Sequence, residues 1–162
     1  SHIGFIPEDR EDPVYRRQLE ATRRVSDALA ERGLKFGLET GQEEAWLQKQ
    51  FIEEVARENL RVNFDPANMI LYGKQKPIEA LETLRDYVFH VHCKDGRWPT
   101  EEGKLGTEVP LGEGEVDIPA YIAKLKEIGY TYVLTIEREA GEDRIGDILR
   151  AKALLERLRD EG

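Results

Sequence analysis

The sequence has 162 residues, of which 40% are hydrophobic and 35% charged, with a formal net charge of −9 at pH 7. This composition is typical of one globular domain or part of one, and the acidic balance disfavours a nucleic-acid partner, which usually needs a basic patch. No apolar run approaches the roughly 18–20 residues of a membrane-spanning helix. The single cysteine, Cys93, excludes an internal disulfide and suits a reducing compartment. We therefore expect a cytoplasmic protein with no membrane partner.

Along the chain, strand-like and helix-like apolar patterns alternate. Short apolar runs predict five strands, at residues 2–6, 35–39, 60–64, 87–92 and 132–136. Amphipathic segments predict helices that follow them, at about residues 13–31, 43–58, 77–84, 117–129 and 143–159. Residues 94–115 contain five glycines and no periodicity, which predicts a long loop, and loops of that length are more often functional than accidental.

Helix faces follow from the same periodicity. In the helix at residues 13–31 we expect Val25 to share a face with Leu19, and in the helix at 43–58 we expect Trp46 to face inward with Phe51. Strands that alternate with helices imply a parallel sheet, and nearly continuous apolar strands imply that both faces are buried. An open doubly wound sheet and a (β/α)8 barrel both satisfy this pattern.

Four predicted strands end in a side chain that can bind a metal ion. Glu39, Asp65, His92 and Glu137 lie at, or directly after, the carboxyl ends of consecutive predicted strands. In barrels that edge is where active sites form. A single strand-end carboxylate is more often a turn or helix-capping residue, but four in phase indicate one shared site. Carboxylates with an imidazole suit Mn²⁺, Mg²⁺ or Co²⁺ better than a thiolate-seeking metal.

Six segments occur in an order and spacing that identify a family. They are Ser1–Pro7, Gly37–Gly41, Asn63–Asn68, His90–Asp95, Pro110–Asp117 and Thr135–Glu139. Over nearly its whole length the sequence resembles the xylose isomerase-like sugar phosphate isomerases and epimerases, a barrel superfamily that also contains endonuclease IV.

The resemblance implies an α/β fold of the (β/α)8 TIM-barrel type. Residues 1–162 would form a single partial barrel domain covering roughly strands 4–8 and their helices, with the N-terminal strands missing. A piece of this kind leaves two sheet edges open, which invites pairing. We expect either a homo-oligomer or the missing N-terminal half of the same barrel to cover them.

The resemblance also implies roles for particular residues. One divalent metal ion would be held by Glu39, Asp65, His92 and Glu137. His92 is preferred to His90 as the ligand, because the family's histidine precedes an x-x-Asp element, here Cys93-Lys94-Asp95. Four further residues are expected to contact substrate: Asn68, His90, Lys94 and Arg97.

By the same resemblance, the activity would be that of a metal-dependent sugar or sugar phosphate isomerase or epimerase. Glu39 and Glu137 would be the catalytic pair that transfers a proton through an enediolate. Three alternatives stay open: a metal-dependent dehydratase of inosose type, an endonuclease IV-like phosphodiesterase and a non-catalytic barrel module. The phosphodiesterase would need additional histidine ligands, and the chain has only His2, His90 and His92.

Overall fold

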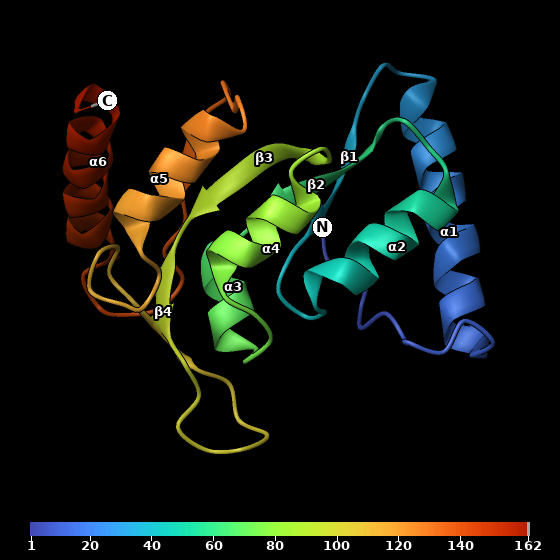
Figure 1. Cartoon of the computed structure of the whole chain (residues 1–162), viewed down its shortest axis with the longest axis horizontal. Helices are drawn as coiled ribbons and strands as arrows, with labels where there is room; N and C mark the ends of the chain where they lie inside the picture. The colour runs from blue at the N-terminus through green and yellow to red at the C-terminus, as the bar shows by residue number, and fades with distance from the viewer. Residues whose placement is uncertain (162) are drawn as a thin grey trace.

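A parallel sheet organises the chain, of which a computed structural model describes residues 1–161 (Figure 1). Its strands lie in the order β1 (Phe36–Glu39), β2 (Leu60–Phe64), β3 (Val88–Cys93) and β6 (Leu134–Ile136). The helices are α1 (Pro13–Ala30), α2 (Ala45–Val55), α3 (Pro66–Leu71), α4 (Pro77–Leu84), α5 (Ile118–Glu127) and α6 (Arg144–Asp160). A separate antiparallel pair consists of β4 (Asp95–Arg97) and β5 (Thr107–Val109).

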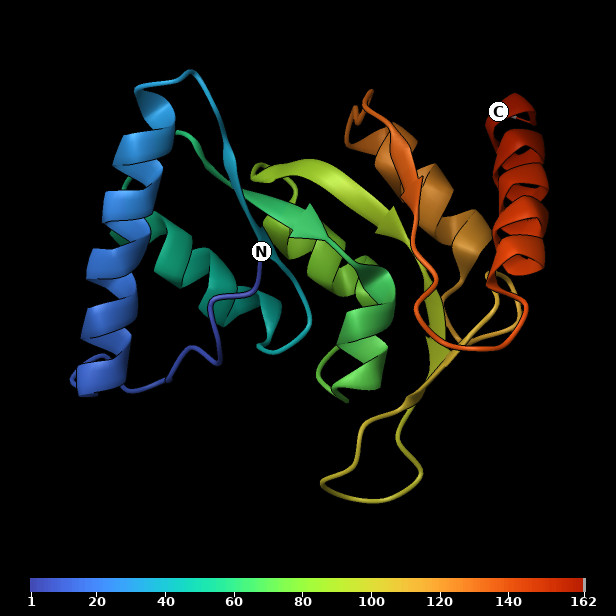
Figure 2. The ribbon, with the colours of Figure 1, turned by 180° about the vertical axis from the view of Figure 1, so that it is seen from behind.

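The two faces of the parallel sheet differ in chemistry. Helices α2, α4 and α5 cover one face, and the opposite face is turned towards the viewer in Figure 2. Successive strand residues point to opposite faces, so Val62 and Phe64 of β2 lie in the core, fully buried, while Asn63 between them lies on the other face. The helix-free face therefore carries polar side chains and is only half-buried, and the prediction that both faces are buried is wrong for this part of the barrel.

The predicted strand at residues 2–6 does not form. Only Ser1 pairs with β1: its amino group donates to the Gly37 carbonyl at 2.8 Å, and Glu39 N–H donates to the Ser1 carbonyl at 3.0 Å. Gly4 has a φ of +83°, which ends the extended course of the backbone. The side-chain amide of Gln18 then binds the carbonyls of Ile3 and Phe5, both at 3.0 Å.

Other departures from the predicted elements are local. Residues 94–115 hold the β4–β5 hairpin, and α3 starts directly after Asp65, whose side chain accepts from Asn68 N–H at 3.0 Å. Val25 and Trp46 are exposed rather than inward-facing. No helix among residues 1–161 combines the length and apolarity required to cross a membrane.

Candidate metal centre

Four side chains converge at the carboxyl edge of the sheet. Glu39, Asp65, His92 and Glu137 each offer one ligand atom, and these atoms all lie within 4.8 Å of one another. Nδ1 of His92 is central: it lies 3.2 Å from Glu137 Oε2, 3.4 Å from Asp65 Oδ2 and 3.6 Å from Glu39 Oε1. Asp65 and His92 are buried, and the two glutamates are half-buried.

Strand register explains why these residues meet. Parallel strands end at the same edge of a sheet, so consecutive strands bring their last residues side by side. Glu39 closes β1 and Asp65 follows β2, while His92 lies in β3 opposite Thr135 of β6. Glu137 follows β6 and stays beside β3, because its N–H donates to the Cys93 carbonyl at 3.2 Å.

The carboxylates dominate the electrostatics of this cluster. Burial by itself would lower the pKa of His92, but hydrogen bonds to Asp65 and Glu137 outweigh burial and raise that pKa to about 10. The hydrogen bond from His92 is also the main reason that the pKa of Glu137 falls to about 2, against the opposing effect of burial. Glu137 is thus held in the charged form, and the cluster attracts positive charge.

Lys94 is the cation that the chain itself supplies to the cluster. It is almost fully buried, and its Nζ donates to Glu137 Oε2 at 2.9 Å and to Glu139 Oε2 at 2.6 Å. Asp65 lies 3.8 Å away. Burial would lower the pKa of Lys94, but the three carboxylates raise it, so the ammonium group is charged.

The donor set fits one divalent cation. Three carboxylates and one imidazole combine the ligand types that Mn²⁺, Mg²⁺ and Co²⁺ accept. Lys94 offsets only part of the charge of the carboxylates around it. The cluster could therefore bind a metal ion, with Nδ1 of His92 as the imidazole ligand atom because it faces the carboxylates.

Three of the four residues predicted to contact substrate lie at this cluster. Asn68 donates from Nδ2 to Glu39 Oε1 at 3.2 Å, and the His90 ring lies 5.7 Å from the His92 ring. Lys94 is the third. Arg97 is exposed on the hairpin, where its guanidinium donates to the Glu113 carbonyl at 3.1 Å. The structure does not bring Arg97 together with the others.

Sequence reasoning missed several residues that shape the site. Asn63 lies 3.1 Å from His92 Nε2 through its Nδ2 and 2.7 Å from His90 Nδ1 through its Oδ1, and Thr135 Oγ1 lies 2.9 Å from His90 Nε2. His2 approaches Glu39 Oε1 at 3.4 Å. Strand alternation could have placed Asn63 and Thr135 on the polar face, because each lies between two apolar residues of its strand.

Asp95 secures the segment that follows Lys94. Its buried carboxylate accepts four backbone N–H groups, from Gly96 at 2.8 Å, Gly112 at 2.9 Å, Gly114 at 3.0 Å and Val116 at 3.0 Å. A Cβ on Gly114 would lie 2.1 Å from Asp95 Oδ1, so only glycine allows this approach. One side chain thus holds together both ends of the segment from residue 95 to residue 116, next to the four clustered side chains.

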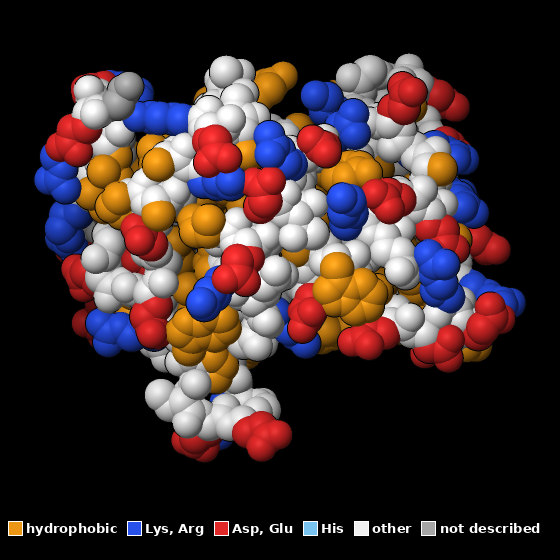
Figure 3. All heavy atoms as spheres, viewed as in Figure 1, with side chains coloured by type: hydrophobic (Ala, Val, Ile, Leu, Met, Phe, Trp, Pro, Cys, Tyr) orange, Lys and Arg blue, Asp and Glu red, His pale blue; other side chains and the backbone are white. Residues whose placement is uncertain are grey.

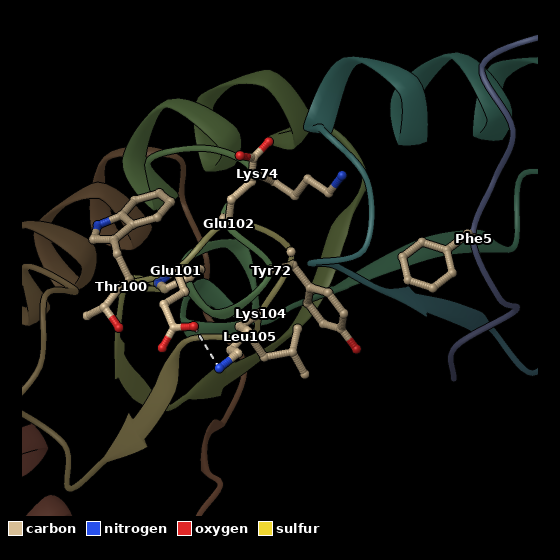
Figure 4. Close-up of a pocket in the computed structure, with 12 residues that line it drawn as sticks. Phe5, Tyr72, Lys74, Thr100, Glu101, Glu102, Lys104 and Leu105 are labelled. Carbon is tan, nitrogen blue, oxygen red and sulfur yellow. Dashed lines mark ion pairs between the residues drawn. The ribbon is translucent and has the colours of Figure 1, made fainter.

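A cavity of about 580 Å³ lies outside the cluster, between the tip of the β4–β5 hairpin and the end of α3. Figure 4 shows Phe5 and Tyr72 on one side and the hairpin residues, with the Glu101–Lys104 ion pair, on the other. Phe5 and Tyr72 pack edge to face, with ring centroids 6.2 Å apart. None of the four clustered side chains lines this cavity.

A parallel β/α array, with a side-chain cluster that could bind a cation at the carboxyl ends of its strands, is the arrangement in which (β/α)8 barrels form their active sites. The model of the xylose isomerase-like TIM barrel family matches residues 1–160, and this chain belongs to that family. The predicted family and fold class are thereby confirmed.

Solved relatives extend this assignment. A xylose isomerase domain protein from Planctomyces limnophilus is 45% identical, with a TM-score of 0.92 over 99% of this chain and 57% of its own. A family member from Mycobacterium smegmatis, solved with magnesium, is 20% identical (TM-score 0.70; 95% of this chain, 54% of that one). A D-allulose 3-epimerase from Methylomonas sp., solved with D-allulose, is 21% identical (TM-score 0.66; 92% and 51%). The last two likenesses show the fold alone.

The chain is shorter than the proteins that it matches. It spans 53% of a curated relative, MJ1311 of Methanocaldococcus jannaschii, and 57% of the Planctomyces structure. An activity and a substrate belong to a complete barrel, and for this chain they are therefore stated as proposals.

Proposed function

We propose that this chain carries the metal-binding part of a divalent-metal-dependent sugar isomerase or epimerase. The observation that carries the proposal is the convergence of four ligand atoms within 4.8 Å at the ends of four parallel strands. Relatives of the same fold support it, because one was solved with magnesium and another is an epimerase solved with a ketose. We propose further that the remaining barrel strands lie against β1 and β6 and complete the substrate pocket.

Glu39, Asp65, His92 and Glu137 would hold the cation. When bound, the ion would supply Lewis-acid polarisation of a sugar carbonyl, which acidifies the neighbouring C–H bond. Glu39 and Glu137 approach His92 Nδ1 from different strands, β1 and β6, so the two carboxylates can face a substrate carbon from different sides. In the proposed reaction one carboxylate takes a proton from carbon, and the other returns a proton.

Neighbouring side chains would prepare these two glutamates differently. Lys94 binds Glu137 Oε2, which keeps that carboxylate ionised and fixes its direction. Asn68 binds Glu39 Oε1 through a neutral amide, and no lysine or arginine pairs with Glu39 among the described residues. Polar atoms of Asn68, His90 and Lys94 lie close enough to the cluster to form hydrogen bonds with sugar hydroxyls. Arg97 could contact the same sugar only if the β4–β5 hairpin moved.

Calorimetric titration with Mn²⁺ tests the site. We expect one-to-one binding by the full chain, loss of that binding in His92→Ala, and unchanged binding in Glu79→Gln, an exposed carboxylate of α4. Equal affinity in His92→Ala and the unsubstituted chain would overturn the proposed cluster as the metal site.

A turnover screen tests the reaction class. Ketoses, ketose phosphates and a keto-inositol are offered, with Mn²⁺, to a complete barrel that contains this chain. The keto-inositol tests the alternative of an inosose-type dehydratase. We expect C–H exchange with solvent deuterium on a ketose, and a loss of at least about a hundredfold in Glu137→Gln, since general acid–base groups typically contribute that much. Normal turnover in Glu137→Gln would contradict the assigned role.

A further inference from the structure

A line of hydrogen-bonding side chains crosses the polar face of the sheet behind the metal-binding cluster. Strand register builds it: Asn63 of β2 pairs with Glu39 of β1 on one side and with His90 of β3 on the other. The Asn63 amide reaches His92 Nε2 at 3.1 Å and His90 Nδ1 at 2.7 Å, and His90 Nε2 reaches Thr135 Oγ1 at 2.9 Å. The line therefore runs from His92 to β6.

Each side chain in this line can donate or accept hydrogen bonds in only a few ways. A neutral imidazole has one N–H donor and one acceptor nitrogen, and a side-chain amide has a donor end and an acceptor end. Fixing the direction of one hydrogen bond thus fixes the direction of all three. Two directions satisfy every member, and they differ by a half-turn of the Asn63 amide, which exchanges Oδ1 and Nδ2.

A cation on His92 permits only one of these directions. Nδ1 faces the three carboxylates, so an ion held there takes the Nδ1 lone pair and leaves the ring hydrogen on Nε2. Nε2 must then donate, and Asn63 must present Oδ1 to it. Nδ2 of Asn63 consequently donates to His90 Nδ1, and His90 carries its own hydrogen on Nε2, directed at Thr135.

We propose that Asn63 is a positioning residue that holds Nε2 of His92 for metal binding, and that His90 and Thr135 fix the direction of the Asn63 amide. The inference rests on the metal site proposed above. One contact opposes it: after the half-turn, Asn63 Oδ1 occupies the place of Nδ2, which lies 3.5 Å from Glu39 Oε2. A cation bound by Glu39 offsets that contact between two acceptors.

The imidazole tautomers give the direct test. Long-range ¹H–¹⁵N correlation spectra of the labelled full chain, saturated with diamagnetic Mg²⁺, report which nitrogen of each histidine carries hydrogen. We expect the Nε2–H form for both His92 and His90. The Nδ1–H form of His90 in the Mg²⁺-saturated protein would overturn the proposal, because Asn63 would then be accepting from His90 instead of donating to it.

Mn²⁺ affinity tests the energetic consequence. Asn63→Leu keeps the branching at Cγ but removes both polar ends of the amide. It should raise the Mn²⁺ Kd about 10–100-fold, as expected when the partner of a metal-binding histidine is lost. Thr135→Val should raise it a few-fold, whereas Thr135→Ser, which keeps the hydroxyl, should leave it unchanged. In an Asn63→Leu background Thr135→Val should have no further effect, because the line is already broken.

These outcomes separate two failures. No Mn²⁺ binding by the unsubstituted chain would overturn the metal site and the inference with it. Normal binding, with Asn63→Leu within twofold of the unsubstituted Kd, would leave the metal site standing and overturn only the role of Asn63. The matched Thr135 variants and the tautomer spectra decide the question even where Asn63→Leu fails to fold.

Discussion

At the scale of single residues, buried carboxylates serve different purposes in this chain. Asp65 faces His92 in the cluster at the strand ends, and Asp95 accepts hydrogen bonds from backbone N–H groups. Glu43 does neither: it is buried after β1, and its Oε1 accepts from Ile6 N–H at 2.8 Å. Burial raises the pKa of Glu43, and the hydrogen bond from Ile6 only partly opposes this effect.

The raised pKa of Glu43 predicts a loss of folding stability that depends on pH. The unfolded chain ionises this group near its ordinary pKa of 4.5, and the folded chain does so at higher pH, so stability falls as the pH rises through the folded pKa. Glu43→Gln keeps an acceptor for Ile6 without the charge. Calorimetry should show a higher unfolding midpoint for Glu43→Gln at pH 7, with the difference vanishing towards pH 4.

Glu58, an exposed carboxylate, supplies the control for this experiment. Glu58→Gln should change the midpoint little at either pH. An advantage of Glu43→Gln that stays constant between pH 4 and pH 7 would contradict the explanation, because a protonated glutamic acid carries no buried charge to remove.

At the scale of elements, the β4–β5 hairpin is tied to the end of β6. Glu108 of β5 accepts from the Arg138 guanidinium at 2.7 Å and from Glu139 N–H at 2.9 Å, and Arg138 also binds Asp147 of α6 at 2.7 Å. Arg138 and Glu108 are each only 8% exposed. Because Arg138 follows Glu137 directly, this ion-pair network fixes the backbone that presents a predicted metal ligand.

Removing Glu108 should therefore destabilise the protein. Glu108→Ala leaves a buried guanidinium short of one partner, and breaking such a pair costs about 3 kcal/mol. Glu101→Ala breaks the 2.7 Å ion pair with Lys104 on the same hairpin, whose side chains are 65% and 67% exposed. That loss should stay below about 0.5 kcal/mol.

Urea unfolding of the two variants measures both values. Equal losses of stability would show that the Arg138 network contributes no more than a surface ion pair. A large loss confined to Glu108→Ala, together with weaker Mn²⁺ binding, would connect the hairpin to the position of Glu137.

At the scale of the whole molecule, the sheet ends at β6 on one side and at β1 on the other, where only Ser1 pairs with the edge. Beside β6, Tyr132 and Val133 are 65% and 64% exposed although both are large and apolar. Elsewhere, the face seen in Figure 3 intersperses acidic and basic side chains with small apolar patches. The chain covers 57% of its Planctomyces relative, and we propose that further strands of the barrel cover both edges.

An open edge predicts association of this 162-residue chain when it is studied alone. Val133→Lys places a charge beside the β6 edge, a substitution that opposes edge-to-edge pairing, and should weaken self-association about tenfold or more. Val25→Lys, on the exposed side of α1, is the matched control. Sedimentation velocity over a range of concentrations measures both, and equal association constants would exclude the β6 edge as the contact.

Much of the fold could be predicted from short sequence patterns. Aspartate caps and helix-starting prolines, as at Asp117 and Pro119, mark helix starts in the sequence itself, and β2 and β6 lie where apolar runs predict them. Trp46 was misplaced because periodicity identifies a face only when tertiary partners exist to cover it. The strand predicted at residues 2–6 failed because Gly4 adopts a positive φ that apolar content does not reveal.

The sequence by itself determined which side chains stand at the strand ends, since a run of apolar residues and the polar residue closing it are neighbours in the chain. Only the tertiary structure decided which polar atoms meet. Asn63 contacts His90 and His92, and His90 contacts Thr135, because three strands far apart in sequence are held in one register. Register depends on the packing of the whole sheet against its helices, and no local pattern encodes it.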